Sequence, residues 1–202
     1  MNSITFVGMD VHKATITVAV ARDWREVEDL GTILNTPEAV AKLVKKLGPI
    51  ETLSFCYEAG PTGYGIYRQI VGLGGKCMVV ASSLIPEKPG DRIKTDRRDA
   101  RKLARLLRAG ELTPVWVPDE EHEAFRQLIR AREVFKDDAA RKKHQIGKFL
   151  LINGIHQPTV MRAWTEKHMQ WLAGLEFKFE AQKMVLTKYL RSLQDAEEVL
   201  KE

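Results

Sequence analysis

ITFVGMDVHKATITVAVA, residues 4–21, holds two strand-like segments separated by a very short connection. Residues 4–8 are a short apolar run, which is typical of a buried strand. Residues 14–21 alternate threonine with Ile16, Val18 and Val20, the period-2 pattern of a second strand. Because only residues 11–13 separate the two, we expect a β-hairpin with Asp10 just past the end of its first strand.

The chain continues from this hairpin as strand, helix, strand, helix and strand. Thr36-Pro37-Glu38 has the residue types of a helix start, and Gly48-Pro49 has those of a helix end. A strand meander followed by βα units predicts an α/β fold, with a mixed five-stranded sheet and helices on its faces. The remaining predicted elements are strands over residues 27–34, 52–57 and 76–81, and helices over about 36–47 and 64–72.

The second half of the chain is mainly helical in pattern. Thr95 or Asp96 begins a helix that ends at Gly110, and a short extended piece is expected over residues 112–117. Residues 119–153 form a long helical pattern, which indicates a projecting helix or a helical hairpin with an oligomer seam. Helices over about 165–175 and 179–201 complete the prediction. We therefore expect two domains, residues 1–118 and residues 119–202.

Composition narrows the class of protein. The chain has 202 residues, of which 44% are hydrophobic, so it has enough apolar surface to bury a core. The formal net charge of +5 favours an anionic partner such as nucleic acid, although an ordinary basic protein has the same balance. The N-terminus is too short and polar for a signal peptide, and apolar runs fall short of the roughly 18 residues that span a membrane. We expect a cytoplasmic protein without a membrane partner.

Four acidic residues are the candidate site. Asp10 and Glu58 each follow a predicted strand, and Asp96 and Asp99 lie three residues apart at a helix start, so that both face the same way. Carboxylates that converge need a counter-charge, and Mg²⁺ prefers such oxygen ligands. Each acid also has an ordinary alternative: Asp10 as a turn residue, and Asp96 and Asp99 as a helix cap and a partner of the helix dipole.

Basic residues lie close to these acids in the sequence. The candidates for contact with a phosphate backbone are Lys13, Lys94, Arg97, Arg98 and Arg101. The alternative is that the arginines are salt partners on a solvated helix face and that Lys13 points to solvent. His12 is not a convincing metal ligand on this pattern, because no second His or Cys is spaced to join it.

Three motifs carry a resemblance to a known family. They are VGMDVHK over residues 7–13, YEAGPTGY over residues 57–64 and KTDRRDA over residues 94–100. Their order and spacing closely resemble those of the DEDD transposases of bacterial insertion sequences, of the IS110 type with its IS1111 branch. The resemblance covers roughly residues 4–158.

This resemblance implies a fold, a site and partners. The N-terminal domain would be similar to the RuvC resolvase, with a ribonuclease H-like fold whose catalytic Asp10, Glu58, Asp96 and Asp99 bind Mg²⁺, or Mn²⁺ in its place. A coiled-coil segment would follow, and then a C-terminal domain that supplies a serine for strand cleavage. Family members act on donor and target DNA, are guided by an RNA, and work as dimers or tetramers.

The sequence stops about where the serine domain would begin. We therefore expect the metal-binding domain and helical connector of a transposase, without its C-terminal serine domain. Two alternatives remain: a stand-alone Holliday-junction-type endonuclease, and a non-catalytic nucleic-acid-binding module. If the acids do converge, we also expect Asp99→Ala to raise thermal stability in metal-free buffer, because it relieves repulsion.

Overall fold

The structure is a computed structural model that describes residues 3–86 and 95–201. The chain divides into two compact units, Met1–Val117 and Pro118–Glu202, and each is described by itself. In the described part of the chain, no helix has the length and apolar character needed to cross a membrane.

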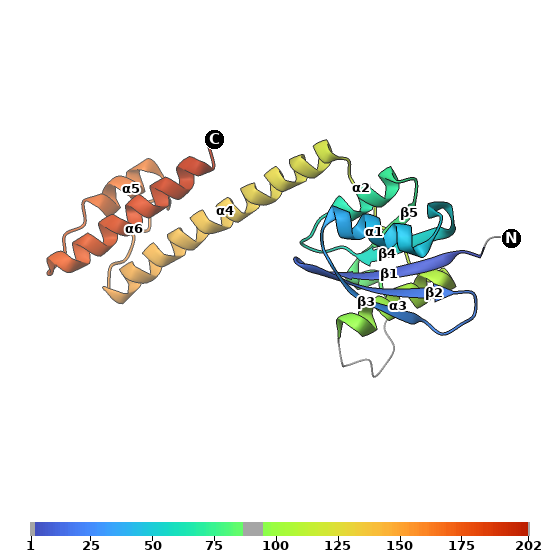
Figure 1. The fold of residues 1–202 in the computed structure, drawn as a ribbon. Coiled ribbons are helices and arrows are strands. Elements are labelled where there is room, and N and C mark those ends of the chain that lie inside the picture. The colour runs from blue at the N-terminus through green and yellow to red at the C-terminus, as the bar shows by residue number, and fades with distance from the viewer. Residues whose placement is uncertain (1–2, 87–94, 202) are drawn as a thin grey trace. The chain divides into compact units, whose positions relative to one another are not determined.

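A five-stranded sheet forms the centre of the first unit (Figure 1). Its order is β3-β2-β1-β4-β5, and β1 pairs antiparallel with β2 and parallel with β4. The mixed sheet and the ribonuclease H-like α/β fold predicted from the sequence are confirmed. The strands are β1 (Thr5–Val11), β2 (Thr15–Arg22), β3 (Glu28–Leu34), β4 (Leu53–Glu58) and β5 (Lys76–Val80).

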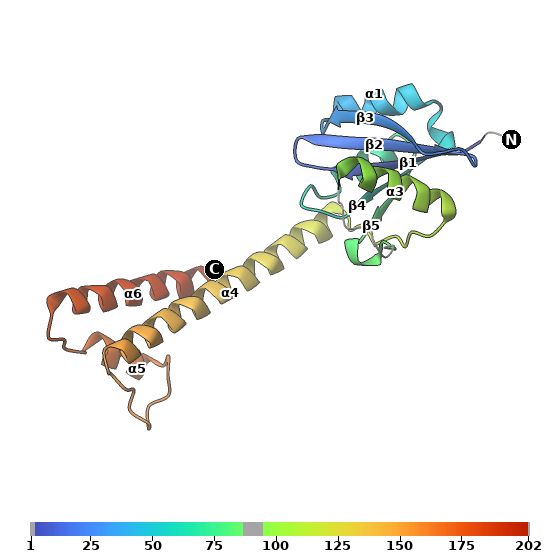
Figure 2. The same cartoon turned by 90° about the horizontal axis from the view of Figure 1, so that it is seen from below.

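Helices cover both faces of this sheet. On one face α1 (Pro37–Leu47) and α2 (Gly65–Gly72) pack against alternate residues of β1 and β4, including the fully buried Met9 and Tyr57. On the other face lies α3 (Asp96–Ala109), as Figure 2 shows. Two short 3₁₀ helices, η1 (Ile50–Thr52) and η2 (Ser82–Leu84), precede β4 and follow β5. The predicted extended piece over residues 112–117 contributes one antiparallel bridge to β5, between Pro114 and Val80.

Small residues let α3 approach the sheet closely. Ala100 and Ala104 of α3 are fully buried against Ala19 and Ala21 of β2. Beneath them lies Gly8 of β1, where an added Cβ would come within 2.3 Å of the Ala100 carbonyl oxygen and 2.4 Å of the Ala104 nitrogen. Only glycine fits such a contact between backbones. The spacing between α3 and β1 is therefore set by residue size.

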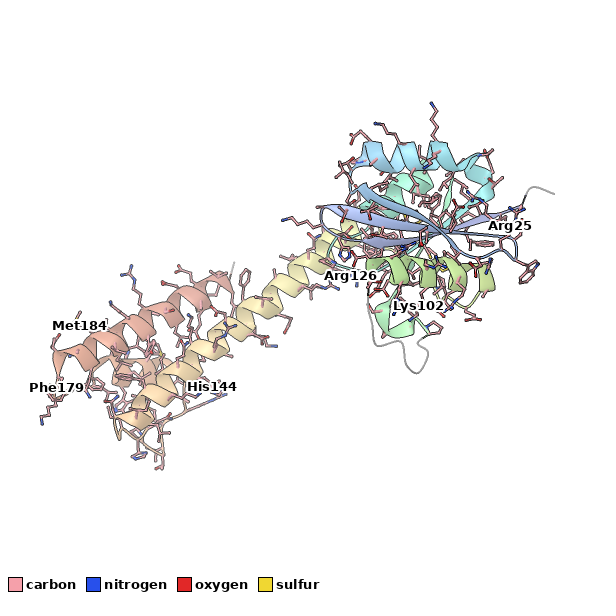
Figure 3. The ribbon with its side chains drawn as sticks, turned by 60° about the horizontal axis from the view of Figure 1, so that its bottom comes forward. Arg25, Lys102, Arg126, His144, Phe179 and Met184 are labelled. Carbon is pink, nitrogen blue, oxygen red and sulfur yellow. The ribbon has the colours of Figure 1, made fainter. Side chains whose placement is uncertain are left out.

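The second unit consists of α4 (Glu120–Ile152), α5 (Glu166–Ala173) and α6 (Glu180–Val199). In Figures 1 and 2, α6 runs alongside the later turns of α4, and Ile146, Leu172 and Leu193 are fully buried in the core that the three helices share. Figure 3 labels Phe179 and Met184, at the start and in the early turns of α6; both are more than half exposed. The long predicted helix is present as a 33-residue helix.

Candidate metal site

Asp10 and Glu58 lie on neighbouring parallel strands. The register pairs Gly8 with Cys56 and Met9 with Tyr57, so Asp10 stands beside Glu58 in the next position. Side chains alternate along a strand, and therefore both acids face the same side of the sheet as Gly8 and Cys56, which is the α3 side. The prediction that Asp10 lies past the end of its strand is wrong: β1 continues to Val11 because its pairing with β2 extends to Ile16. Glu58 also lies within its strand, as the last residue of β4.

Asp96 and Asp99 occupy the first turn of α3. The hydroxyl of Thr95 accepts a hydrogen bond from the Arg98 backbone N–H at 3.3 Å, so Thr95 is the N-cap and Asp96 is not. Asp96 lies one turn before Ala100, and Asp10 lies two residues after Gly8. The close contact of Gly8 with Ala100 therefore brings the start of α3 to the end of β1.

His12 lies between two of the acids. Its Nε2 is 3.2 Å from Oδ2 of Asp10 and 3.5 Å from Oδ2 of Asp96. One ligand atom from each of the three residues lies within 4.8 Å of the other two. The backbone of His12 is fixed, because its N–H donates to the Thr15 carbonyl and its own carbonyl accepts from the Asn35 side-chain amide, both at 2.8 Å.

The electrostatics of Asp10 reflect this crowding. Burial raises the pKa of the Asp10 carboxyl, the nearby His12 lowers it, and the charges of Asp96 and Asp99 raise it again. The pKa is raised overall, so the ionised form of Asp10 is disfavoured here, first by burial and then by the neighbouring acids. The pKa of His12 is raised in turn, chiefly by the charge of Asp10. A cation placed among these groups would stabilise the ionised carboxylates.

Glu58 reaches the same region by a different contact. Its carboxylate accepts a hydrogen bond from the Ser82 hydroxyl of η2. Asp10, His12 and Glu58 all line one open pocket, together with Lys13 and Asn35. The structure thus clusters Asp10 with Asp96 and couples it electrostatically to Asp99, while Glu58 shares the pocket with Asp10 but is hydrogen bonded to Ser82.

Comparison with known proteins gives the family. A family model described as "Transposase", of the DEDD type of IS110 elements, matches residues 7–153, which include all four acids. The chain belongs to the DEDD transposase family. It is 46% identical over 191 residues to "Putative transposase y4qE" of Sinorhizobium fredii, covering 93% of this chain and 49% of that protein. It is 37% identical over 204 residues to "Transposase for insertion sequence element IS1533" of Leptospira borgpetersenii, covering 100% of this chain and 59% of that protein. The chain therefore spans between about half and three-fifths of these relatives.

In this transposase-family chain, the basic residues differ in their surroundings. Nε and Nη2 of Arg97 lie 2.6 Å from Oδ2 of Asp29 on β3, and Nη1 of Arg101 lies 2.9 Å from the same oxygen. Partial burial acts to raise the pKa of Asp29, but the hydrogen bonds from the two arginines outweigh it and leave the pKa lowered. Arg97 and Arg101 therefore do form salt bridges, which is the alternative to phosphate contact that the sequence left open.

Among the other predicted basic residues, Lys13 is exposed in the β1–β2 connection beside the pocket, and Arg98 is exposed in the first turn of α3. Lys94 lies outside the described residues. Lys102, further along α3, is labelled in Figure 3.

Three residues near the acids are not candidates on sequence grounds. The sequence pattern argues against His12 as a metal ligand, because no other His or Cys is spaced to join it. In the structure, the groups beside His12 are the carboxylates of Asp10 and Asp96. The signal that could have found it is its position two residues after Asp10, which puts both on one face of an extended chain. Ser82 and Asp29 have no comparable signal, because their contacts join segments 24 and 68 residues apart.

Proposed function

We propose that this chain is the metal-binding part of an insertion-sequence transposase, in which Asp10, Glu58, Asp96 and Asp99 hold a divalent cation. The observation that carries the proposal is the juxtaposition of Asp10 with the first turn of α3, next to the strand position of Glu58. Capping alone does not account for it, because Thr95 already caps α3. Burial raises the pKa of Asp10, and the charges of Asp96 and Asp99 raise it further.

The residues present fit a hard cation. Carboxylate oxygens are the ligands that Mg²⁺ prefers, and Mn²⁺ accepts the same set. In phosphoryl transfer such ions supply charge that stabilises the attacking and leaving oxygens. The chain's own contribution would be to orient the four carboxylates by the β1–β4 register and by the contact of α3 with Gly8. These residues would serve strand cleavage and transfer during transposition.

Nucleic acid is the proposed partner. Lys13 lines the pocket, and Arg97, Arg98 and Arg101 follow Asp96 on α3, so basic residues of two elements lie close to the acids. Asp29 would keep Arg97 and Arg101 in place, while the outer face of Arg97, whose side chain is 72% exposed, stays accessible to a phosphate. Donor and target DNA, a guide RNA, the serine of a further domain and a cytoplasmic location are parts of the same proposal.

Self-association belongs to the proposal as well. The first half of α4 carries apolar side chains that are between 42% and 66% exposed, namely Phe125, Leu128, Ile129, Val134 and Phe135. Such a row on a long helix is suited to pairing with a second copy of the chain. Sedimentation analysis tests this: Leu128→Glu should lower the average mass, whereas Met184→Glu, at a similarly exposed position on α6, should not. Equal masses for wild type and Leu128→Glu would contradict this part of the proposal.

Metal-dependent DNA binding tests the proposed function. A labelled four-way junction and a duplex of equal length are titrated with the chain in Mg²⁺ and in EDTA, with fluorescence anisotropy as the readout. We expect Mg²⁺ to strengthen binding to wild type several-fold and to have little effect on Asp10→Asn and Glu58→Gln. An equal Mg²⁺ effect in all three proteins would contradict the proposal, and metal-independent binding would favour the non-catalytic module. Junction cleavage by this chain alone would favour the stand-alone endonuclease.

A further inference from the structure

The side chain of His12 lies close to two of the four acids. Its Nε2 approaches Oδ2 of Asp10 and Oδ2 of Asp96 at 3.2 and 3.5 Å. These two acids come from different elements, β1 and α3, and the imidazole lies within reach of both. Without a cation the ring can pair with both carboxylates as an imidazolium; with a cation between the acids, the same ring in its neutral form offers Nε2 as a ligand.

The separations suit one coordination sphere. With metal–ligand distances of about 2.0–2.2 Å, two ligand atoms on the same ion lie roughly 3 to 4.4 Å apart. The ligand atoms of Asp10, His12 and Asp96 all lie within 4.8 Å of one another, so a small closure would bring them to one ion. Glu58 is not in this group; its carboxylate is hydrogen bonded to Ser82.

The position of His12 is also fixed in advance. Its backbone N–H donates a hydrogen bond to the carbonyl of Thr15 in β2. Its carbonyl accepts a hydrogen bond from the side-chain amide of Asn35, which follows β3. The backbone at His12 is therefore held by β2 and by the residue that follows β3, so binding an ion needs only rotations about the side-chain bonds of His12. Groups held in place before binding lose less entropy when they bind.

We propose that His12 Nε2 is a direct ligand of the cation held by Asp10 and Asp96, so that this part of the site has one nitrogen and several oxygen donors. The inference rests on the proposed function. An all-oxygen set suits Mg²⁺, whereas an imidazole nitrogen shifts preference toward Mn²⁺ and other transition metals. His12 would thus make the site bind Mn²⁺ more tightly than Mg²⁺.

Pulsed electron paramagnetic resonance of the whole chain loaded with one equivalent of Mn²⁺ tests this. Wild type should show the ¹⁴N modulation of a coordinated imidazole, and His12→Gln should lose it and bind Mn²⁺ about tenfold more weakly. His12→Glu, which replaces the nitrogen donor with oxygen, should still bind Mn²⁺ without the modulation and should shift preference toward Mg²⁺. His122→Gln is the matched control, since His122 also contacts an aspartate, Asp119, at 2.8 Å, and it should behave as wild type.

The outcomes separate the two proposals. If Mn²⁺ binds and Asp10→Asn abolishes binding, but wild type shows no ¹⁴N modulation or His12→Gln retains it, the role of His12 is overturned and the carboxylate site stands. If Mn²⁺ does not bind the wild-type chain, the proposed function fails and this inference fails with it. Because His12 is exposed, its variants should fold, which thermal unfolding in EDTA verifies.

Discussion

Gly8 of β1 lies directly beneath Ala104 of α3, so closely that a Cβ on Gly8 would come within 2.4 Å of the Ala104 backbone nitrogen. The obstructing atoms belong to the helix backbone and cannot rotate away. At Gly8, therefore, the backbone of the sheet directly contacts the backbone of α3. Asp10 lies two residues beyond this point on β1, and Asp96 lies two turns before Ala104 on α3.

Gly8→Ala should therefore push α3 away from the sheet. We expect a loss of about 1–3 kcal/mol in the free energy of unfolding, the usual cost of overpacking a filled core, together with weaker Mn²⁺ binding. Chemical denaturation and metal titration measure the two effects. Gly72→Ala in α2 is the control, because nothing lies within 4 Å of its added Cβ, and it should be neutral or stabilising by up to about 1 kcal/mol. Equal stability of the two variants would argue against the close contact.

Asp29→Asn should loosen the start of α3 in another way. It weakens the hydrogen bonds from Arg97 and Arg101, and ion pairs that are partly open to solvent contribute up to about 1 kcal/mol. We expect that loss in urea unfolding and a several-fold loss in metal affinity. Glu28→Gln removes the neighbouring but well-exposed pair with Arg22, and should change stability by no more than about 0.5 kcal/mol. If the two variants lost equal stability, Asp29 would not hold α3.

The elements of the fold could be predicted from the sequence more fully than the contacts between them. Alternation in residues 14–21 and the capping residues Thr36 and Thr95 are local signals, so strands and helices can be located from them. The motifs around Asp10, Glu58 and Asp96 identify the family. The contacts of Asp29 with Arg97 and of Ser82 with Glu58 join segments that are distant in the sequence, so no local pattern predicts them. The predicted end of β1 is wrong because pairing, not hydrophobicity, extends the strand past Gly8.

Asp99→Ala should raise the melting temperature in EDTA. Burial raises the pKa of the partly buried Asp10 carboxyl, and the charge of Asp99 raises it further, so removing Asp99 relieves repulsion. We expect this gain to exceed the loss of a favourable acid at the start of α3. Glu38→Ala is the matched control, also in a first helical turn. Hydrogen bonds from its own backbone and from Thr36 lower the pKa of Glu38, so this variant should be less stable than wild type. A clear drop for Asp99→Ala would make Asp99 a structural residue.

His168 should make the second unit sensitive to acid. Its Nδ1 accepts from the Trp164 backbone N–H, its ring stacks on Trp171, and burial lowers its pKa from the ordinary 6.5. Below about pH 6.5 the unfolded chain therefore binds more protons than the folded one, so stability is full above that pH and is lost as pH falls. We expect a lower melting temperature at pH 5 than at pH 7.5, and a smaller difference in His168→Gln. Identical pH profiles would contradict this role for His168.

Calorimetric titration of the metal-free chain with Mg²⁺ and Mn²⁺ tests the central claim most directly. Wild type should bind, and Asp10→Asn and Glu58→Gln should each lose at least about tenfold in affinity, since a metal site depends strongly on the groups that hold it. Glu28→Gln, which removes an exposed acid on β3, should bind as wild type does. If Asp10→Asn and Glu58→Gln bound both ions with wild-type affinity, the four acids would not form a metal site and the proposed function would be wrong.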